Sequence, residues 1–491
     1  MWEPYMEWSI TDNSFSGNNP YDVVARVVFE HIPTKKQHIT EMFYAGDNEG
    51  SHIWKFRFTG TATGQWKYSS ESQNKELDGL HGNFEIVENG DSAQMGFLSH
   101  RNNQYSMVYG NKGEVKPYRF MVFMDQAKFL VFDSHLKSKT FDEHPLFLYQ
   151  DSNLVQAYID EAANNAFDVL YFHPGYSHVW TDGTDTANGI NPRIETFEIL
   201  ENMITQAHKQ GKRLHIWMWG DQERVATPIP LKGGINGEVD QRLQRYIAAR
   251  LGPLPGWSMG YGFDLHEWTN QQNLNHWAAF MHQHLGWDHL LSARGFTLEG
   301  DNNMNSYDGF GRNVELFTSA HGPKNKREVL EDMQSDSTRP HFYEERHSYK
   351  RPKFDLDMDG TRRLMWWQML SGGMGGWYGF YGDGRNTVEK GNYPYQNPEQ
   401  FFTAKRFWDT YIDFDMKATI DGKTELMMLE GKHKVIIYAE ESDAIQLPEK
   451  SFAESYIAFD TKITYREIPF DKPTTNVWYP PYASDWVVVV R

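Results

Sequence analysis

The sequence predicts an α/β fold, in which a closed (β/α)8 barrel of the TIM type lies between a β-sandwich on its N-terminal side and a smaller β domain on its C-terminal side. Three observations lead to this prediction. Short strand-like runs fill the first 95 residues, strands and helices alternate from about 118 to 410, and helical periodicity disappears after about 415. A chain of 491 residues is also too long for one hydrophobic core.

Residues 1–95 alternate between short strands and turns. Val23–Phe29 is rich in β-branched residues, and Trp54–Phe58 alternates aromatic with basic residues. Turn signals such as Ser16–Pro20 and Asp47–Gly50 recur at short intervals between such runs. This pattern is typical of an antiparallel sandwich of roughly seven strands. We expect residues 96–117 to be a connection to the next domain.

Between residues 118 and 410, apolar strand-like runs alternate with amphipathic helical segments. The eight candidate strands are Phe129–Phe132, Phe167–Phe172, Arg213–Trp219, Trp257–Phe263, Leu290–Ala293, a segment near Asn305–Phe310, Arg339–Tyr343 and Gly375–Phe380. Alternation of this kind over eight strands predicts a closed parallel barrel. An open doubly wound sheet would share the alternation, but the glycine-rich turn that normally follows its first strand is missing from the sequence.

The last segment, residues 411–491, returns to strand-like runs without helical periodicity. Lys434–Tyr438, Tyr456–Phe459 and Trp486–Val490 are the clearest of them. They predict a second, C-terminal β-sandwich.

Composition narrows the classes of function. The net charge of -18 argues against a nucleic-acid partner, which requires a basic surface, and no apolar run is long enough for a membrane helix. The absence of cysteine removes disulfides, thiolate nucleophiles and cysteine-based zinc sites. Aromatic residues make up 15% of the chain; most fill cores, but indole rings also pack well against the apolar face of a sugar.

Two of the predicted strands end near glutamates. Glu267 follows the fourth strand, and Glu344 and Glu345 follow the seventh. Active groups of such barrels lie where strands end, and the fourth and seventh strands stand across the barrel mouth. A facing pair of carboxyl groups is what glycosidic bond cleavage requires, one to protonate the leaving oxygen and one to attack the anomeric carbon.

This order of strands and acids resembles clan A glycoside hydrolases, whose acid/base follows the fourth strand and whose nucleophile ends the seventh. That clan usually has Asn before the first glutamate, where this chain has His266. The motifs Trp54–Phe58 and Thr63–Tyr68 resemble the sandwich that precedes apiosidase-like barrels in bacterial polysaccharide hydrolases, and Ser484–Trp486 with its valine strand resembles their C-terminal domain. The resemblance implies a retaining hydrolase.

The resemblance implies Glu267 as the acid/base and Glu345 as the nucleophile, with Glu344 as the alternative because only one of two adjacent strand residues faces the barrel. Asp264 competes with Glu267 for the acid role, although it could instead bind loop amides. We expect the remaining strand ends to supply substrate-binding residues, with core packing or loop capping as the alternative for each; the candidates are Asp133, His135, His173, Trp219, Asp221, His266, Arg294, Tyr307, Arg346, His347 and Trp377. In the clan a strand-six Tyr or His contacts the nucleophile, and Tyr307 is the candidate for that contact.

We expect no cofactor. Asp355, Asp357 and Asp359 match the first half of an EF-hand calcium loop, but its twelfth position, which should be Glu, is Trp366. A helix N-terminus, whose dipole favours carboxylates, explains the cluster equally well.

The expected activity is therefore hydrolysis of a polysaccharide or its oligosaccharides. Arg294, Arg346, His135 and His347 would give the cleft local positive charge, which favours an anionic or sulfated glycan, such as one from marine algae. The alternatives are a non-catalytic glycan-binding protein that keeps the barrel as a scaffold, and a barrel enzyme of another class.

No signal-peptide pattern follows Met1; we expect a periplasmic or secreted protein whose signal peptide lies outside the printed chain, with a cytoplasmic location as the alternative.

Overall fold

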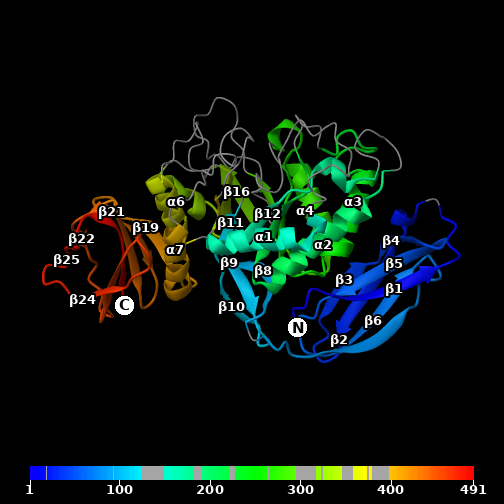
Figure 1. Cartoon of the computed structure of the whole chain (residues 1–491), viewed down its shortest axis with the longest axis horizontal. Helices are drawn as coiled ribbons and strands as arrows, with labels where there is room; N and C mark the ends of the chain where they lie inside the picture. The colour runs from blue at the N-terminus through cyan, green and yellow to red at the C-terminus, as the bar shows by residue number, and fades with distance from the viewer. Residues whose placement is uncertain are drawn as a thin grey trace.

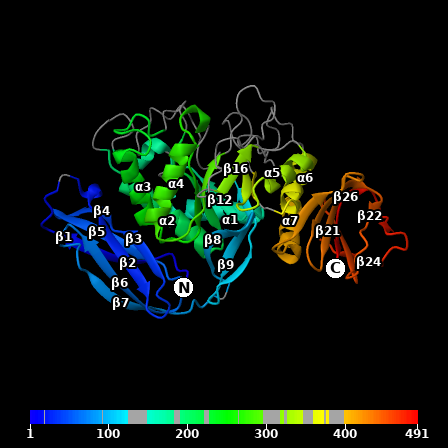
Figure 2. The ribbon, with the colours of Figure 1, turned by 180° about the vertical axis from the view of Figure 1, so that it is seen from behind.

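The computed structural model describes residues 1–17, 19–91, 93–123, 149–181, 190–220, 227–262, 265–294, 317–321, 325–345, 358–372, 375–378 and 398–491. An N-terminal pair of β-sheets, a central parallel barrel with its helices, and a C-terminal β-sheet follow one another along the longest axis (Figure 1). Seen from behind, the barrel again separates the two β domains (Figure 2). The mixed α/β class predicted from the sequence is confirmed.

The N-terminal domain consists of two antiparallel sheets around an aromatic core. One sheet has the order β1 (Met6–Asp12), β5 (Ser51–Phe58), β4 (Phe43–Asn48), and the other has the order β3 (Gln37–Glu41), β2 (Ala25–His31), β6 (Gly64–Ser72), β7 (His81–Ile86). Phe29, Phe56 and Trp66 are completely buried between them. Trp8 stacks on Phe56 with ring centroids 5.0 Å apart, so the inward half of each alternating strand fills this core.

The segment expected to be a plain connection forms a third antiparallel sheet. Its strands are β8 (Met95–Arg101), β9 (Gln104–Tyr109) and β10 (Glu114–Pro117). The sheet packs against the amino-terminal end of the barrel, where Tyr105 stacks on Phe120 at 4.7 Å and Arg213 donates to the Gly96 carbonyl at 3.1 Å. We call it the floor sheet. Its short strands are stabilised by the barrel that they cover, which local sequence patterns do not reveal.

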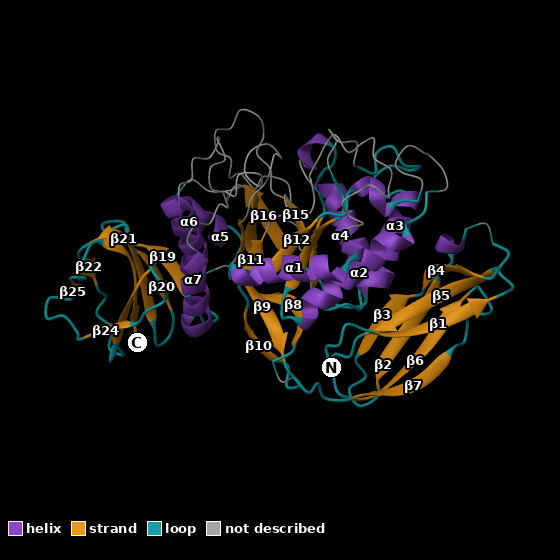
Figure 3. Cartoon of the chain, in the orientation of Figure 1, coloured by secondary structure: helices purple, strands orange, loops and turns teal. Residues whose placement is uncertain are grey.

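The barrel strands pair in parallel and in chain order. They are β11 (Phe120–Phe123), β12 (Val169–Phe172), β13 (Arg213–Trp217), β14 (Trp257–Gly260), β15 (Leu291–Arg294), β16 (Phe317–His321), β17 (His341–Glu345) and β18 (Gly375–Tyr378). β18 pairs in turn with β11, so the parallel sheet curls round on itself. The floor sheet lies below its strands in Figure 3.

Among the described residues, a helix follows each of seven of these strands. These helices are α1 (Ser152–Asn164), α2 (Ile194–Lys209), α3 (Glu238–Leu251), α4 (Gln271–Leu285), α5 (Lys326–Gln334), α6 (Met358–Leu370) and α7 (Pro398–Tyr411). The connection between β15 and β16, residues 295–316, lies entirely outside the described residues. Buried residues such as Phe197, Leu200, Ile204 and Ala207 of α2 recur at helical spacing, which explains why this helix was readable from the sequence.

Two of the eight expected strands are displaced. The first strand of the ring is Phe120–Phe123, not Phe129–Phe132, and the sixth is Phe317–His321, not a segment near Asn305–Phe310. Both expected segments lie outside the described residues. Phe-Met-Val-Phe and Phe-Leu-Val-Phe are equivalent apolar runs nine residues apart, so only pairing with β12 and β18 distinguishes them. β16 carries only two apolar residues and gives little strand signal.

The barrel interior is filled by alternate residues of its strands. Val122, Tyr171, Trp217 and Phe342 are completely buried together with residues of the floor sheet. A Cβ atom on Gly260 would lie 2.4 Å from the Trp217 ring, so β14 needs glycine at this point. The lower barrel is therefore a packed core.

The C-terminal sheet has the antiparallel order β19 (Lys417–Ile420), β20 (Met427–Glu430), β21 (Val435–Ser442), β26 (Ser484–Val490), β23 (Tyr456–Asp460), β24 (Ile468–Phe470), with a small pair β22 (Ile445–Gln446) and β25 (Val477–Trp478). Val487 and Val489 join the core formed with α6 and α7, whereas Val488 and Val490 join a second core with Trp478. Both faces of β26 are therefore covered.

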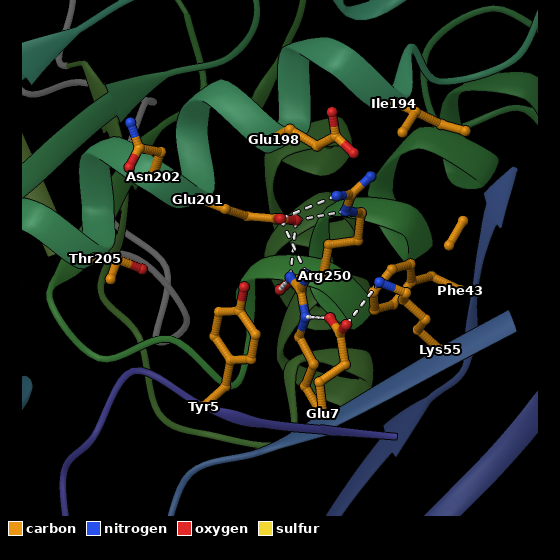
Figure 4. Close-up of a pocket in the computed structure, with 12 residues that line it drawn as sticks. Tyr5, Glu7, Phe43, Lys55, Ile194, Glu198, Glu201, Asn202, Thr205 and Arg250 are labelled. Atoms are coloured by element: carbon orange, nitrogen blue, oxygen red, sulfur yellow. Dashed lines mark hydrogen bonds and ion pairs between the residues drawn. The ribbon is translucent and has the colours of Figure 1, made fainter. Parts of the chain in front are cut away.

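A buried ion cluster joins the N-terminal domain to the barrel helices (Figure 4). Glu201 of α2 accepts hydrogen bonds from Arg57 of β5 and from Arg250 of α3, with the closest contacts at 2.8 and 2.5 Å. Arg57 also donates to Glu7 of β1 at 2.7 Å. Burial opposes ionisation of Glu201, but the two guanidinium groups hold its pKa below the ordinary value. A small cavity of about 370 Å³ borders this cluster.

Glu201→Ala should destabilise the protein strongly. It leaves two guanidinium groups buried without their shared carboxylate, and breaking a buried pair in this way typically costs about 3–5 kcal/mol. Glu198→Ala is the matched control, because Glu198 is an exposed glutamate one turn earlier on the same helix. Chemical denaturation followed by circular dichroism measures both changes. Equal losses in the two variants would contradict a special role for the cluster.

A second buried contact ties α5 to β17. The Tyr343 hydroxyl donates to Asp332 of α5 at 2.7 Å, and Tyr343 packs beside Val329 and Met333 on the outer side of the barrel strand. Burial raises the pKa of Asp332 to about 7, with further contributions from Glu328 and Glu331 and an opposing one from the Tyr343 hydrogen bond.

This pKa predicts a pH dependence of stability. The folded protein binds the Asp332 proton more tightly than the unfolded chain does, so the stabilisation is complete below about pH 4 and is lost as the pH rises towards 7. The slope is at most ~1.4 kcal/mol per pH unit. Asp332→Asn should abolish this component, as measured by unfolding free energies at pH 4, 5, 6, 7 and 8. An unchanged slope in the variant would show that Asp332 titrates normally.

Candidate active site

The carboxyl ends of the barrel strands meet at one rim, on the side opposite the floor sheet (Figure 1). This is the rim at which a parallel barrel gathers residues from distant parts of the chain. Glu267 follows β14, the fourth strand of the ring, and Glu344 and Glu345 are the last two residues of β17, the seventh. The backbone therefore brings the predicted glutamates to the same end of the barrel.

The strand register at β17 separates the two adjacent glutamates. Ser319 pairs with Phe342 and Ala320 with Tyr343, but the next residue of β16, His321, pairs with Glu345. The strand register therefore shifts at this point, and Glu344 falls between the two pairing positions. Because of this register shift, Glu345 and not Glu344 takes the pairing position beside His321.

Glu267 ends a short 3-10 helix, Leu265–Glu267, that begins five residues after β14. It is exposed, while Leu265 and Trp268 on either side of the turn are buried. The Thr269 amide donates to the Leu265 carbonyl at 2.8 Å and closes the turn. The turn thus anchors two apolar neighbours and presents a carboxyl group to solvent.

Other predicted residues occupy strand ends as well. Arg294 is the last residue of β15 and pairs with Ser319, and Trp377 in β18 pairs with Val122. His173 directly follows β12, is half-buried, and its Nδ1 lies 2.6 Å from the Trp217 carbonyl oxygen. His266 belongs to the Glu267 turn. The remaining candidates lie outside the described residues: Asp133, His135, Asp221, Asp264, Tyr307, Arg346 and His347.

Two assignments of the sequence prediction need correction. Tyr307 precedes β16 instead of following it, so His321, not Tyr307, ends the sixth strand. The error arose from the displaced sixth strand. Trp219 was expected to line the cleft but is completely buried, and its indole nitrogen donates to Asp240 at 3.1 Å. A ring without accessible surface offers no platform for a sugar.

His321 and Asp240 are the residues that sequence reasoning missed. His321 lies in a strand with almost no apolar pattern, so its ordinal position could not be counted. Asp240 lies in the first turn of α3, where an acidic residue is ordinary. Knowing which strand pairs with which would have revealed that His321 ends the sixth strand. The burial of Asp240, in contrast, depends on contacts between separate elements of the fold.

Of the three aspartates that match a calcium loop, only Asp359 lies among the described residues. Asp359 lies in the first turn of α6, where it forms an ion pair with Arg362 and lies 3.8 Å from Lys462. Asp355 and Asp357 fall outside the described residues. Within the described ranges no group of three or more His, Asp or Glu residues has the arrangement of a metal site. In the same part of the chain, no helix has the length and apolarity needed to cross a membrane.

Comparisons with known proteins agree with this architecture. Residues 2–73 match a family model described as a domain of unknown function, DUF5060. No curated protein matches the sequence. The chain is similar, with a TM-score of 0.69 and 13% identity, to a protein from Bacteroides vulgatus that is provisionally named a glycoside hydrolase, over 100% of this chain and 98% of that one.

Two further structures are similar at the same level of identity. One is described as a family 5 glycoside hydrolase from Bacteroides vulgatus, with a TM-score of 0.56 and 13% identity over 81% of this chain and 92% of that chain. The other is described as a glycoside hydrolase, with a TM-score of 0.50 and 12% identity over 81% of this chain and 97% of that chain. The chain therefore has the fold of glycoside hydrolases over its whole length.

Proposed function

We propose that this protein is a retaining glycoside hydrolase built on a complete (β/α)8 barrel, with Glu267 as acid/base and Glu345 as nucleophile. The observation that carries the proposal is the position of these glutamates after the fourth strand and at the end of the seventh, at the same rim of a curled parallel sheet. The glycoside-hydrolase fold of the chain supports it.

In the proposed mechanism the two carboxyl groups act on opposite sides of the scissile bond. Glu345 attacks the anomeric carbon as a carboxylate while Glu267, protonated, gives its proton to the departing glycosidic oxygen. A covalent glycosyl ester on Glu345 results. Glu267, now ionised, then removes a proton from water, which attacks the anomeric carbon and releases Glu345. Atoms and charges balance over the two steps, and the product keeps its anomeric configuration.

The register of β17 supports Glu345 over Glu344 as nucleophile. Glu345 pairs with His321, whereas Glu344 falls at the register shift between the two strands. In the clan that the sequence resembles, a strand-six Tyr or His contacts the nucleophile, and His321 now replaces Tyr307 as the candidate for that contact. A hydrogen bond from an imidazole N–H would orient the attacking carboxylate and favour its ionised form.

The proposed substrate is a polysaccharide or its oligosaccharides, and the residues near the rim favour an anionic or sulfated glycan. Arg294 is the last residue of the fifth strand, and Arg346 and His347 directly follow Glu345 in the chain. We propose an apiosidase-like member of the clan and a periplasmic or secreted location.

Purified protein should be incubated with neutral, uronate-containing and sulfated plant and algal polysaccharides, and product release followed by reducing-end assay. Proton NMR of the first product would reveal retention or inversion, and activity on none of these glycans would favour the non-catalytic binding protein.

Substitution of the three glutamates tests their roles. Glu267→Gln should lower hydrolysis of natural glycosides by roughly 10²–10⁴, the usual contribution of a general acid, but spare glycosides with an activated aryl leaving group. Azide should rescue Glu267→Ala and yield a retained glycosyl azide. Glu345→Gln should lose activity on both substrate types, because no intermediate forms.

Glu344→Gln is the matched control for Glu345→Gln, since it makes the same change one residue away. It should keep measurable turnover. Loss of activity in Glu344→Gln with near-normal turnover in Glu345→Gln would move the nucleophile to Glu344. Near-normal turnover of Glu267→Gln on natural substrate would transfer the acid role to Asp264.

A further inference from the structure

Trp268, the residue after Glu267, is the outer member of a stack of three aromatic rings. Its ring lies 5.2 Å from that of Tyr261 at an angle of 22°, and Tyr261 lies 4.9 Å from Trp219 at 25°. Trp219 and Tyr261 have no exposed surface, and Trp268 is 6% exposed. Trp277 of α4 packs edge-on against Trp219. The stack therefore links the ends of β13 and β14 to the turn that carries Glu267.

The buried end of this stack is held by Asp240. One carboxylate oxygen accepts a hydrogen bond from the indole N–H of Trp219 at 3.1 Å. The other accepts hydrogen bonds from the backbone N–H of Asn236 at 2.9 Å and from the side-chain amide of Gln244 at 3.0 Å. Asp240 has no exposed surface, and none of the ion pairs seen among the described residues includes it. Burial raises the pKa of Asp240 to about 6, with its three hydrogen bonds acting in the opposite direction.

Close packing transmits this arrangement to the Glu267 turn. A Cβ atom on Gly262 would lie 2.7 Å from the Gly220 carbonyl oxygen and 3.2 Å from the Trp268 ring. The backbone after β14 thus passes directly between the end of the β13 segment and Trp268. The Trp219 amide also donates to the Tyr261 carbonyl at 3.2 Å. Movement of Trp219 would displace Tyr261 and Trp268 together, because the three rings are stacked in contact with one another.

We propose that Asp240 is a positioning residue for Glu267. By holding the indole N–H of Trp219, it fixes the stack of Trp219, Tyr261 and Trp268, and through Trp268 it fixes the turn from which Glu267 reaches the substrate. The inference rests on the proposed function only in giving Glu267 the acid/base role. A general acid must stand within hydrogen-bond reach of the leaving oxygen, and a displacement of about 1 Å costs much of its effect.

The test compares Asp240→Leu with Asp240→Asn. The amide oxygen of Asn can still accept the Trp219 N–H, whereas Leu cannot. Trp219→Phe is a second variant that keeps an aromatic ring in the stack but removes the N–H, and it covers the case in which Asp240→Leu fails to fold. Glu201→Gln is the control for general destabilisation, because the ion cluster at the N-terminal domain does not include the stack.

The first measurement is kcat/KM on aryl glycosides with poor and good leaving groups, made from the sugar that the polysaccharide screen identifies. In Asp240→Leu and Trp219→Phe, kcat/KM should fall roughly tenfold or more with a 4-methylphenyl leaving group but only little with a 2,4-dinitrophenyl group. Glu267→Gln should show the same pattern more strongly. Asp240→Asn should restore most of the loss. Equal losses on both leaving groups, as expected for Glu201→Gln, would overturn the inference.

The second measurement needs no substrate. The amides of Trp268 and Thr269 donate to the Leu265 carbonyl at 3.2 and 2.8 Å, so their hydrogen exchange reports opening of the Glu267 turn. Exchange of the peptide covering residues 265–270 should accelerate in Asp240→Leu and Trp219→Phe but not in Asp240→Asn or Glu201→Gln. Unchanged exchange would overturn the inference. If exchange is faster in Asp240→Leu and Trp219→Phe but Glu267→Gln shows no leaving-group dependence, Asp240 still controls the turn. In that case Glu267 is not the general acid.

Discussion

The continuous parallel pairing from β11 to β18 and back to β11 is the constraint on which the rest of the structure depends. Because every strand pairs with its neighbours in chain order, residues that follow distant strands reach the same rim. The lower half of the ring is closed by a packed core in which Trp217 and Phe342 meet the floor sheet. The carboxyl rim at the other end of the barrel holds Glu267 and Glu345, the residues of the proposed site.

Buried charges attach both flanking domains to the barrel. Glu201 joins Arg57 and Arg250 on the N-terminal side, and Asp485 of β26 accepts hydrogen bonds from Arg362 and Arg363 of α6 on the C-terminal side. A buried carboxylate must find its partners or remain uncompensated, so these contacts restrict the docking geometry more narrowly than apolar contact would. Asp240, close to the carboxyl rim, is a buried carboxylate of the same kind, but its partner is the indole N–H of Trp219 instead of a guanidinium group.

Strands could be predicted from the sequence where the strand residues themselves are apolar or strand-forming. Residues 213–217, 257–260 and 341–345 were found within a few residues of their true bounds because their side chains are apolar or strand-forming. The first strand was misplaced because Phe120–Phe123 and Phe129–Phe132 are alike, and the sixth because Phe317–His321 hardly differs from a loop. The floor sheet was missed because the barrel that covers it belongs to a later part of the chain. Counting strands nevertheless located Glu267 and the Glu344–Glu345 pair, since two displaced strands left the ordinal numbers unchanged.

The sequence by itself determined the mixed α/β class, the order of the β and barrel regions and the two strand ends that carry glutamates. These follow from periodicity and order, which are properties of neighbouring residues. Only the tertiary structure decided that the strand register shifts so that Glu345 pairs with His321, and that Trp219 is buried against Asp240. Register and burial depend on which distant segments meet, and no local pattern of residues contains that information.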